Sequence, residues 1–231
     1  MSDIISSEID SEIESEVSSF NNCHMYWARL LLLNILKNNG YTKYEHTSGP
    51  IYWGPCDNKQ QYTSVTDCSG FINALIRKTY GLPINWLGKK RPYAATYYEM
   101  INLQNYFIKI TNVWDAKVGD FIVFINLVKT SKNDNTGHIM IINKMPMQIK
   151  EKRPYINNTI QWIINIIDQS SNAHGRTDTR YTNKSTGLGN GNLRIYTDYS
   201  GNIQGYTWST ESYSQYIDKS MRPLVIGRLD I

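Results

Sequence analysis

Apolar residues follow two different patterns along the chain. In the first half they recur every three or four positions, as in amphipathic helices, whereas in the second half they form short continuous runs, as in buried strands. Because the helices precede the strands, the pattern predicts an α+β fold in which N-terminal helices pack on an antiparallel β-sheet. Helices are predicted over residues 22–39, 68–81 and 94–103, and strands over 118–125, 138–143, 159–168, 193–199, 203–208 and 224–229.

The first 20 residues differ in composition from the rest of the chain. They carry six acidic side chains, no lysine and no arginine. This composition predicts a disordered acidic tail, although apolar residues at helical spacing would also allow a helix that forms on a partner. We expect one domain over residues 21–231, in which about 181–231 form a C-terminal β extension. Turn-forming residues predict long loops over 41–66 and 170–192.

The charge pattern limits the classes of partner. The chain has a net charge of +4, and outside the acidic tail basic residues outnumber acidic ones by ten. A cationic body suits an anionic polymer, but its basic residues form no stripe interleaved with aromatic side chains, so no nucleic-acid partner is predicted. The acidic N-terminus lacks the basic start of a signal peptide. The apolar run at 30–33 is too short for a membrane span, so we expect a cytoplasmic protein or export by a non-classical route.

Cys68 is the first candidate for chemistry. It directly precedes an apolar run with helical spacing, and Asp67 before it is a favourable N-cap residue. A thiol at a helix N-terminus faces the positive end of the helix dipole, which favours the reactive thiolate. The alternative is a buried structural cysteine. The chain has three cysteines, an odd number, so a complete set of disulfides is excluded, while a bridge between Cys23 and Cys56 remains open.

A cysteine nucleophile needs a base and a group that orients the base. His138 opens one apolar strand and Asp168 ends the next. In antiparallel neighbours the start of one strand lies beside the end of the other, so Asp168 could accept the imidazole N–H of His138 and fix its tautomer. The alternatives are a hydrogen-bonded structural histidine and a capping aspartate. The spacing of histidines and cysteines predicts no metal site, and no phosphate-binding loop or other cofactor motif occurs.

Three segments resemble the signature blocks of the NlpC/P60 papain-like cysteine peptidases. They are residues 67–71, 118–121 and 137–141, and they occur in the order of the family. Upstream, residues 52–54 resemble the Tyr-x-Gly-Gly block of the family, with proline in place of the second glycine. The resemblance covers roughly residues 48–170 and implies a papain-like fold.

The resemblance also implies catalytic roles. By position, Cys68 corresponds to the nucleophile and His138 to the general base. Asp168 falls where the family usually has His, Asn or Gln, and a carboxylate can orient an imidazole as well as an amide can. The implied activity is that of a cysteine peptidase or amidohydrolase without a cofactor. Its usual substrates are peptide stems of the bacterial cell wall, so the implied partner is a peptide or muropeptide.

Further residues are implied or suggested as substrate contacts. Tyr52 resembles the family tyrosine whose hydroxyl faces the cysteine, and Asp67 and Ser69 match positions that contact the substrate amine and backbone.

The polar run 172–180 lies beyond the minimal family domain. In this run His174 could replace Asp168 as the orienting group, and Arg176 or Arg180 could bind a substrate carboxylate. The alternative for the run is a solvated loop.

Two other functions remain open from the sequence. The same three residues could serve a deamidase, a transglutaminase-like enzyme or an acyltransferase that acts on protein or lipid. Alternatively, the scaffold could be a non-catalytic binding module.

Overall fold

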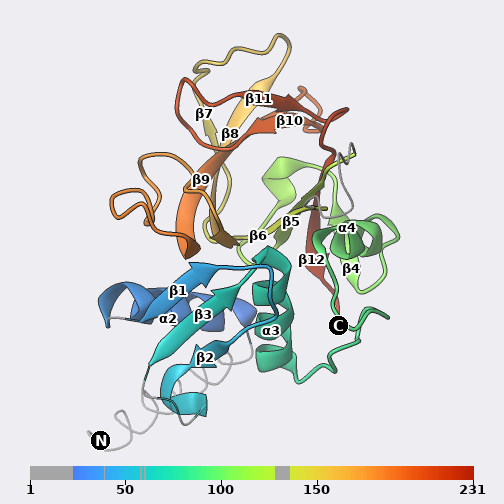
Figure 1. The fold of residues 1–231 in the computed structure, drawn as a ribbon. Coiled ribbons are helices and arrows are strands. Elements are labelled where there is room, and N and C mark those ends of the chain that lie inside the picture. Colours follow the sequence, from blue (N-terminus) through green and yellow to red (C-terminus); the bar gives the residue numbers. More distant parts are fainter. Residues whose placement is uncertain (1–22, 39, 58, 60, 128–135) are drawn as a thin grey trace, which may run out of the picture.

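The computed structural model describes residues 23–38, 40–57, 59, 61–127 and 136–231 (Figure 1). The predicted acidic tail over residues 1–20 therefore lies outside the described residues. In chain order the elements are α2 (His24–Lys37), β1 (Tyr41–Tyr44), β2 (Ile51–Trp53), a 3-10 turn (Gly54–Asp57), β3 (Tyr62–Thr66), α3 (Cys68–Tyr80), α4 (Ala94–Asn102), β4 (Phe107–Ile110), a second 3-10 turn (Val113–Asp115), β5 (Phe121–Ile125), β6 (Gly137–Ile142), β7 (Met147–Ile149), β8 (Ile160–Ser170), β9 (Gly187–Thr197), β10 (Ile203–Thr207), β11 (Tyr216–Asp218) and β12 (Leu224–Leu229).

A nine-stranded antiparallel sheet forms most of the protein. Its strand order is β11-β10-β9-β8-β6-β5-β12-β4, and β7 pairs with β8 beside this path. The last strand of the chain, β12, pairs with both β5 and β4. The region predicted as a C-terminal extension, about 181–231, thus supplies inner strands of the sheet, because β9 and β12 each have two neighbours.

A second, three-stranded sheet has the order β1-β3-β2. β1 pairs with β3 in parallel, whereas β2 pairs with β3 in antiparallel orientation. In Figure 1 this small sheet lies beside the ends of β8 and β9. It occupies residues 41–66, which the turn signals predicted as a loop. The three strands are short and rich in tyrosine and threonine, residues with high strand propensity that the loop prediction underweighted.

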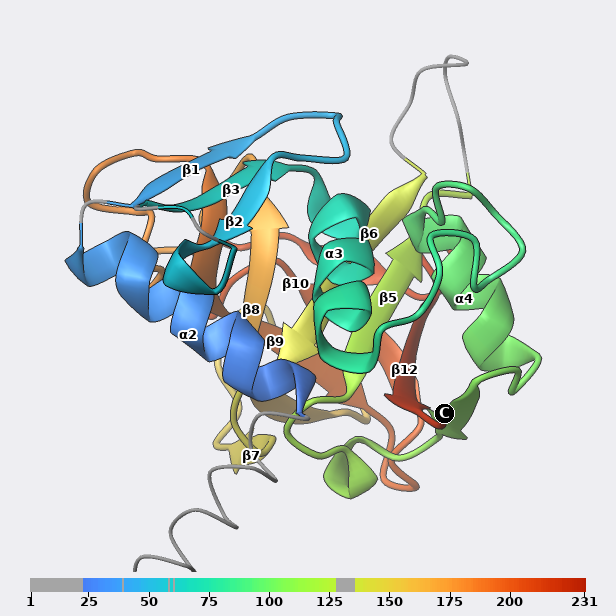
Figure 2. The ribbon, with the colours of Figure 1, turned by 90° about the horizontal axis from the view of Figure 1, so that it is seen from below.

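The protein has two apolar cores, one on each face of the large sheet. Along β6, Ile139 and Ile141 pack in the core that contains the helices, while Met140 packs in the other core. This alternation follows from the two-residue period of a strand. Figure 2 shows α2 and α3 over the face of the large sheet that carries Ile139 and Ile141. The continuous apolar runs in the sequence therefore reflect strands that are buried on both faces.

The predicted fold class, a papain-like α+β fold with N-terminal helices packed on an antiparallel sheet, is wrong. The structure is mostly β: its described α-helices have 14, 13 and 9 residues, whereas the strands form a nine-stranded and a three-stranded sheet. The prediction failed because residues 41–66 and 187–192 were assigned to loops. They form the small sheet and the first half of β9.

The predicted helices are confirmed as elements. α3 ends at Gly81, whose φ of 67° is the left-handed conformation that favours glycine at a helix C-terminus. His24, at the start of α2, is buried and ties the helices together, since Nδ1 lies 2.7 Å from the Tyr80 hydroxyl and Nε2 lies 2.7 Å from the carbonyl of Gly119. Among the described residues, no helix combines the length and apolar character that crossing a membrane requires.

Gln169 joins the two sheets. It lies in β8 and is fully buried. Its Nε2 donates to the carbonyls of Lys43, at 2.8 Å, and Ser64, at 3.2 Å, and its Oε1 accepts from the Ser64 hydroxyl at 2.9 Å. Because Cys68 follows β3 closely and Asp168 precedes Gln169, this junction sets the separation of two candidate site residues.

The first prediction concerns this junction. Replacing Gln169 by Leu removes three hydrogen bonds and leaves the buried Ser64 hydroxyl without its acceptor, so we expect the free energy of unfolding to fall by about 2–3 kcal/mol. Urea unfolding measures the change. Gln148→Leu, at an exposed position of β7, is the matched control and should change stability by less than about 0.5 kcal/mol. Equal effects of the two substitutions would contradict a joining role for Gln169.

Candidate active site

Cys68 begins α3 and follows β3 after a one-residue turn. Asp67 caps the helix: its Oδ1 accepts from the Gly70 N–H at 2.8 Å and from the Ser69 hydroxyl at 3.1 Å. The Cys68 residue is 4% exposed. Cys68 is therefore nearly buried and lies at the N-terminal, positive end of the α3 dipole.

His138, in β6, lies between Cys68 and Asp168. Its Nε2 is 2.6 Å from Asp168 Oδ2, and Cys68 lies close enough to the imidazole to raise its pKa. A carboxylate oxygen can only accept, so Nε2 carries a proton toward Asp168. The structure thus brings Cys68, His138 and Asp168 together.

The surroundings of His138 favour its charged form. Burial by itself lowers the pKa of an imidazole. Here the negative charge of Cys68 and the hydrogen bond to Asp168 outweigh burial and raise the pKa of His138 to about 10. At neutral pH the surroundings therefore favour the imidazolium form of His138.

Asp168 is fully buried and accepts from three side chains. Its Oδ2 contacts both His138 and His174, the latter at 3.1 Å from Nε2, and its Oδ1 lies 2.7 Å from Arg180 Nη2. Although burial alone would raise the pKa of Asp168, the charges of Arg180 and His174 hold it well below its usual value. The carboxylate stays ionised in the interior because its charge is balanced.

His174 is a second donor to Asp168 rather than a substitute for it. Its Nδ1 lies 2.7 Å from the carbonyl of Trp208, and its Nε2 faces Asp168. Both neighbours are acceptors, so the ring donates to both only as an imidazolium. The ring also stacks on the Trp208 indole, with centroids 3.9 Å apart. The two residues that the sequence offered as alternatives for the third position therefore act together.

Arg180 and Asp178 complete the buried charge cluster. Arg180 Nε and Nη2 bind the two carboxylate oxygens of Asp178 at 2.9 and 2.7 Å. Two glycines of β9 make room for the cluster: a Cβ at Gly189 would collide with the Arg180 guanidinium, and one at Gly191 with Asp178. The glycines that suggested a flexible loop thus lie in a strand, where they accommodate charged side chains.

The cluster includes three side chains that could in principle hold a metal ion. The ligand atoms of His138, Asp168 and His174 lie within 4.8 Å of one another. However, both imidazoles already donate directly to Asp168, and Arg180 places a positive charge on its other oxygen. The donor set therefore fits a hydrogen-bonded charge network better than a cation site.

Three residues that the sequence suggested as substrate contacts have other neighbours in the structure: Asp67, Arg176 and Arg180. Asp67 Oδ2 is bound by Arg91 Nη2 at 2.6 Å, so a substrate amine would compete with an arginine. Arg180 is 1% exposed and binds internal carboxylates, which corrects its assignment as a substrate contact. Arg176 is exposed and lies beside Glu211.

Tyr44, rather than Tyr52, lies in the electrostatic field of Cys68. Burial and the negative charge of Cys68 raise the pKa of Tyr44, so its hydroxyl stays protonated as a donor. Tyr52, on β2, instead lies under Lys59, whose Nζ is 5.1 Å from the ring centroid. Tyr44 was missed because it belongs to β1, within the predicted loop. The alternation of β1 was the available signal.

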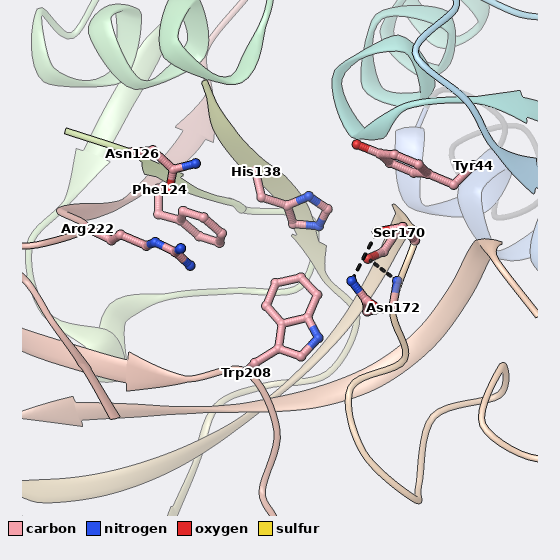
Figure 3. Close-up of a pocket in the computed structure, with 9 residues that line it drawn as sticks. Tyr44, Phe124, Asn126, His138, Ser170, Asn172, Trp208 and Arg222 are labelled. Carbon is pink, nitrogen blue, oxygen red and sulfur yellow. Dashed lines mark hydrogen bonds between the residues drawn. The ribbon is translucent and has the colours of Figure 1, made fainter. Parts of the chain in front are cut away.

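A pocket of about 300 Å³ opens beside His138 (Figure 3). Its wall combines aromatic rings with hydroxyl and amide groups. The lining residues are Tyr44, Phe124, Asn126, His138, Ser170, Ser171, Asn172, Trp208 and Arg222. Tyr44 and His138, whose pKa values both respond to Cys68, border this pocket, so a ligand in it would contact the His138 side of the candidate site.

The free thiols include Cys23 and Cys68. The side chain of Cys56 lies outside the description, so the pairing of that residue stays a prediction.

Comparison with known proteins gives one informative match. The chain is 44% identical to the uncharacterized protein R653 of Acanthamoeba polyphaga mimivirus, and the alignment covers 93% of this chain and 100% of that protein. No family model matches the chain. No solved structure matches it either.

The second prediction concerns Arg180. Arg180→Gln leaves the buried carboxylates of Asp168 and Asp178 without their cation, so we expect a loss of about 3–5 kcal/mol of unfolding free energy. Urea unfolding at neutral pH measures the loss. Arg176→Gln removes the same charge from an exposed position and should cost less than about 0.5 kcal/mol. A small effect at Arg180 would contradict the charge balance described above.

The third prediction concerns the protonation of His138. NMR spectra that detect the ring nitrogens of the four histidines through their long-range couplings to ring protons should show His138 as imidazolium up to about pH 10. Since this pKa lies above that of an unfolded histidine, about 6.5, the interaction stabilises the fold fully below about pH 6.5. The contribution is lost as the pH rises through about 10.

Cys68→Ala is the variant that tests the cause. It removes the charge and one hydrogen bond that raise the pKa of His138, so the imidazole should titrate at lower pH. An unchanged titration would show that Cys68 and His138 do not interact as described.

Proposed function

The chain belongs to the family of the mimivirus protein R653, and we propose that it is a cysteine-dependent amide hydrolase. Cys68 is the nucleophile, His138 the proton carrier and Asp168 the residue that orients the imidazole. The substrate is an amide bond of a peptide, with peptidoglycan stem peptides as the first class to test.

The observation that carries this proposal is the hydrogen bond of His138 to Asp168 at 2.6 Å, with Cys68 close enough to the same imidazole to raise its pKa. A thiol, an imidazole and a carboxylate in this order form the arrangement that activates cysteine nucleophiles. The resemblance of residues 67–71, 118–121 and 137–141 to the NlpC/P60 signature blocks supports the same roles. The proposal concerns the chemistry and does not require a papain-like fold.

In the proposed first step the Cys68 thiolate attacks the amide carbonyl and forms a tetrahedral intermediate. The imidazolium of His138 then gives its proton to the leaving nitrogen, the C–N bond breaks, and a thioester on Cys68 remains. In the second step His138 takes a proton from water, which attacks the thioester and releases the acid. Asp168 holds the ring in position throughout and stays ionised.

The oxyanion needs donors near the sulfur. The first N–H groups of α3 begin at Cys68, and the N-terminal N–H groups of a helix have no partners within the helix. We assign the second donor to the Tyr44 hydroxyl, because Tyr44 lies in the field of Cys68 and borders the pocket. This replaces Tyr52 in the role that the resemblance suggested.

The fourth prediction tests the proposed function. Purified muropeptides and a mixed peptide library are incubated with the protein, and new fragments are sought by mass spectrometry. Cys68→Ala should abolish product formation, and His138→Ala should lower the rate by at least about 100-fold. Cys23→Ala removes another free thiol and should keep full activity.

Two other results would change the conclusion. Products in which an amine replaces water as the acceptor would indicate acyl transfer through the same thioester. If iodoacetamide modifies Cys68 no faster than Cys23, the sulfur is not activated and the remaining interpretation is a binding module.

A further inference from the structure

The pocket beside His138 has an unusual charge distribution. Its lining includes two basic side chains, Arg222 and His138, and no acidic side chain. The other polar groups of the wall are hydroxyls and amides, among them Ser170 and Asn172. A wall of this kind favours a ligand that carries a negative charge.

Arg222 is directed to this pocket by its packing. Its guanidinium carbon lies 5.9 Å from the ring centroid of Phe124, and the same ring lies 5.9 Å from that of His138. Phe124 thus separates the guanidinium from the imidazole. In Figure 3 the Arg222, Phe124 and His138 side chains border the same space, with Trp208 below them. The separation of the guanidinium from the imidazole suits a ligand whose charged group lies several bonds from the atom that contacts His138.

The charge of Arg222 has no internal carboxylate partner in the part of the chain that the structure describes. The buried arginine Arg180 and the half-buried Arg91 each form ion pairs with aspartates. Among the described residues no such pair forms at Arg222. An exposed guanidinium at a pocket mouth suits the bidentate binding of a carboxylate from a ligand.

The acidic residue before Cys68 is also unsuited to a substrate amine. Asp67 is held by Arg91 at 2.6 Å. A free ammonium group of a substrate would have to displace this arginine. The Asp67–Arg91 pair therefore disfavours a cationic substrate independently of Arg222.

We propose that Arg222 selects substrates whose leaving group carries a carboxylate several bonds from the scissile nitrogen. This inference rests on the proposed function. His138 gives its proton to the leaving nitrogen, so the pocket that His138 borders receives the leaving group rather than the acyl group. The substrate class is therefore an amide of an acidic amine, such as a peptide with a carboxylate side chain or a C-terminal carboxylate beyond the cleaved bond.

The test compares two alkylating agents that differ only in charge. Bromoacetyl-β-alanine carries a carboxylate several bonds from the reacting carbon, and bromoacetyl-β-alaninamide is its neutral counterpart. The rate at which each modifies Cys68 is measured by mass spectrometry. We expect the acid to react about fivefold faster than the amide, and the preference to shrink at high salt, which screens an exposed charge.

Variants of Arg222 establish the source of the preference. Arg222→Gln should remove most of the preference for the acid, whereas Arg222→Lys should keep part of it because the charge remains. Arg153→Gln, at an exposed position between β7 and β8, is the matched control and should keep the full preference. Thermal melting verifies that each variant is folded.

The outcomes separate this inference from the proposed function. Rapid modification of Cys68 with equal rates for the two agents, or a preference that persists in Arg222→Gln, overturns the role of Arg222 and leaves the nucleophile intact. Failure of both agents to modify Cys68 faster than Cys23 overturns the nucleophile and the inference together.

Discussion

A single buried carboxylate organises the candidate site. Asp168 lies in the interior at zero exposure, yet it is surrounded by two imidazoles and a guanidinium. An isolated charge could not remain ionised there, so the neighbouring cations are a condition for its role. Its ionised state in turn favours the imidazolium form of His138 and holds the ring through Nε2. The candidate site thus depends on a charge balance in the core.

The two sheets divide the work of placing the site. Cys68 and Tyr44 come from the small sheet and the helix that follows it, whereas His138 and Asp168 come from adjacent strands of the large sheet. The candidate site requires the two sheets to keep their positions relative to each other, and the buried Gln169 side chain connects them. The stability of this junction therefore also maintains the placement of Cys68 relative to His138.

The sequence predicted much of the site but little of the architecture. Short motifs identified Cys68 and His138, and the rule for antiparallel neighbours brought Asp168 to His138, because those relations are local or lie between adjacent strands. Tyr44 and Gln169 could not be found in this way, since their roles arise from the contact between two sheets, one of which looked like a loop. The charge of Arg180 pointed correctly to a carboxylate, but the sequence could not show that its partners are internal.

The glycines of β9 have a consequence for tracing distant members of this family. Asp168, His174, Asp178 and Arg180 must reach one point in the interior, and Gly189 and Gly191 must leave that point empty. The number of residues between Asp168 and the two glycines, Gly189 and Gly191, is therefore constrained by packing as well as by the charge network. A search profile built on this second segment should recognise divergent homologues whose cysteine block has changed.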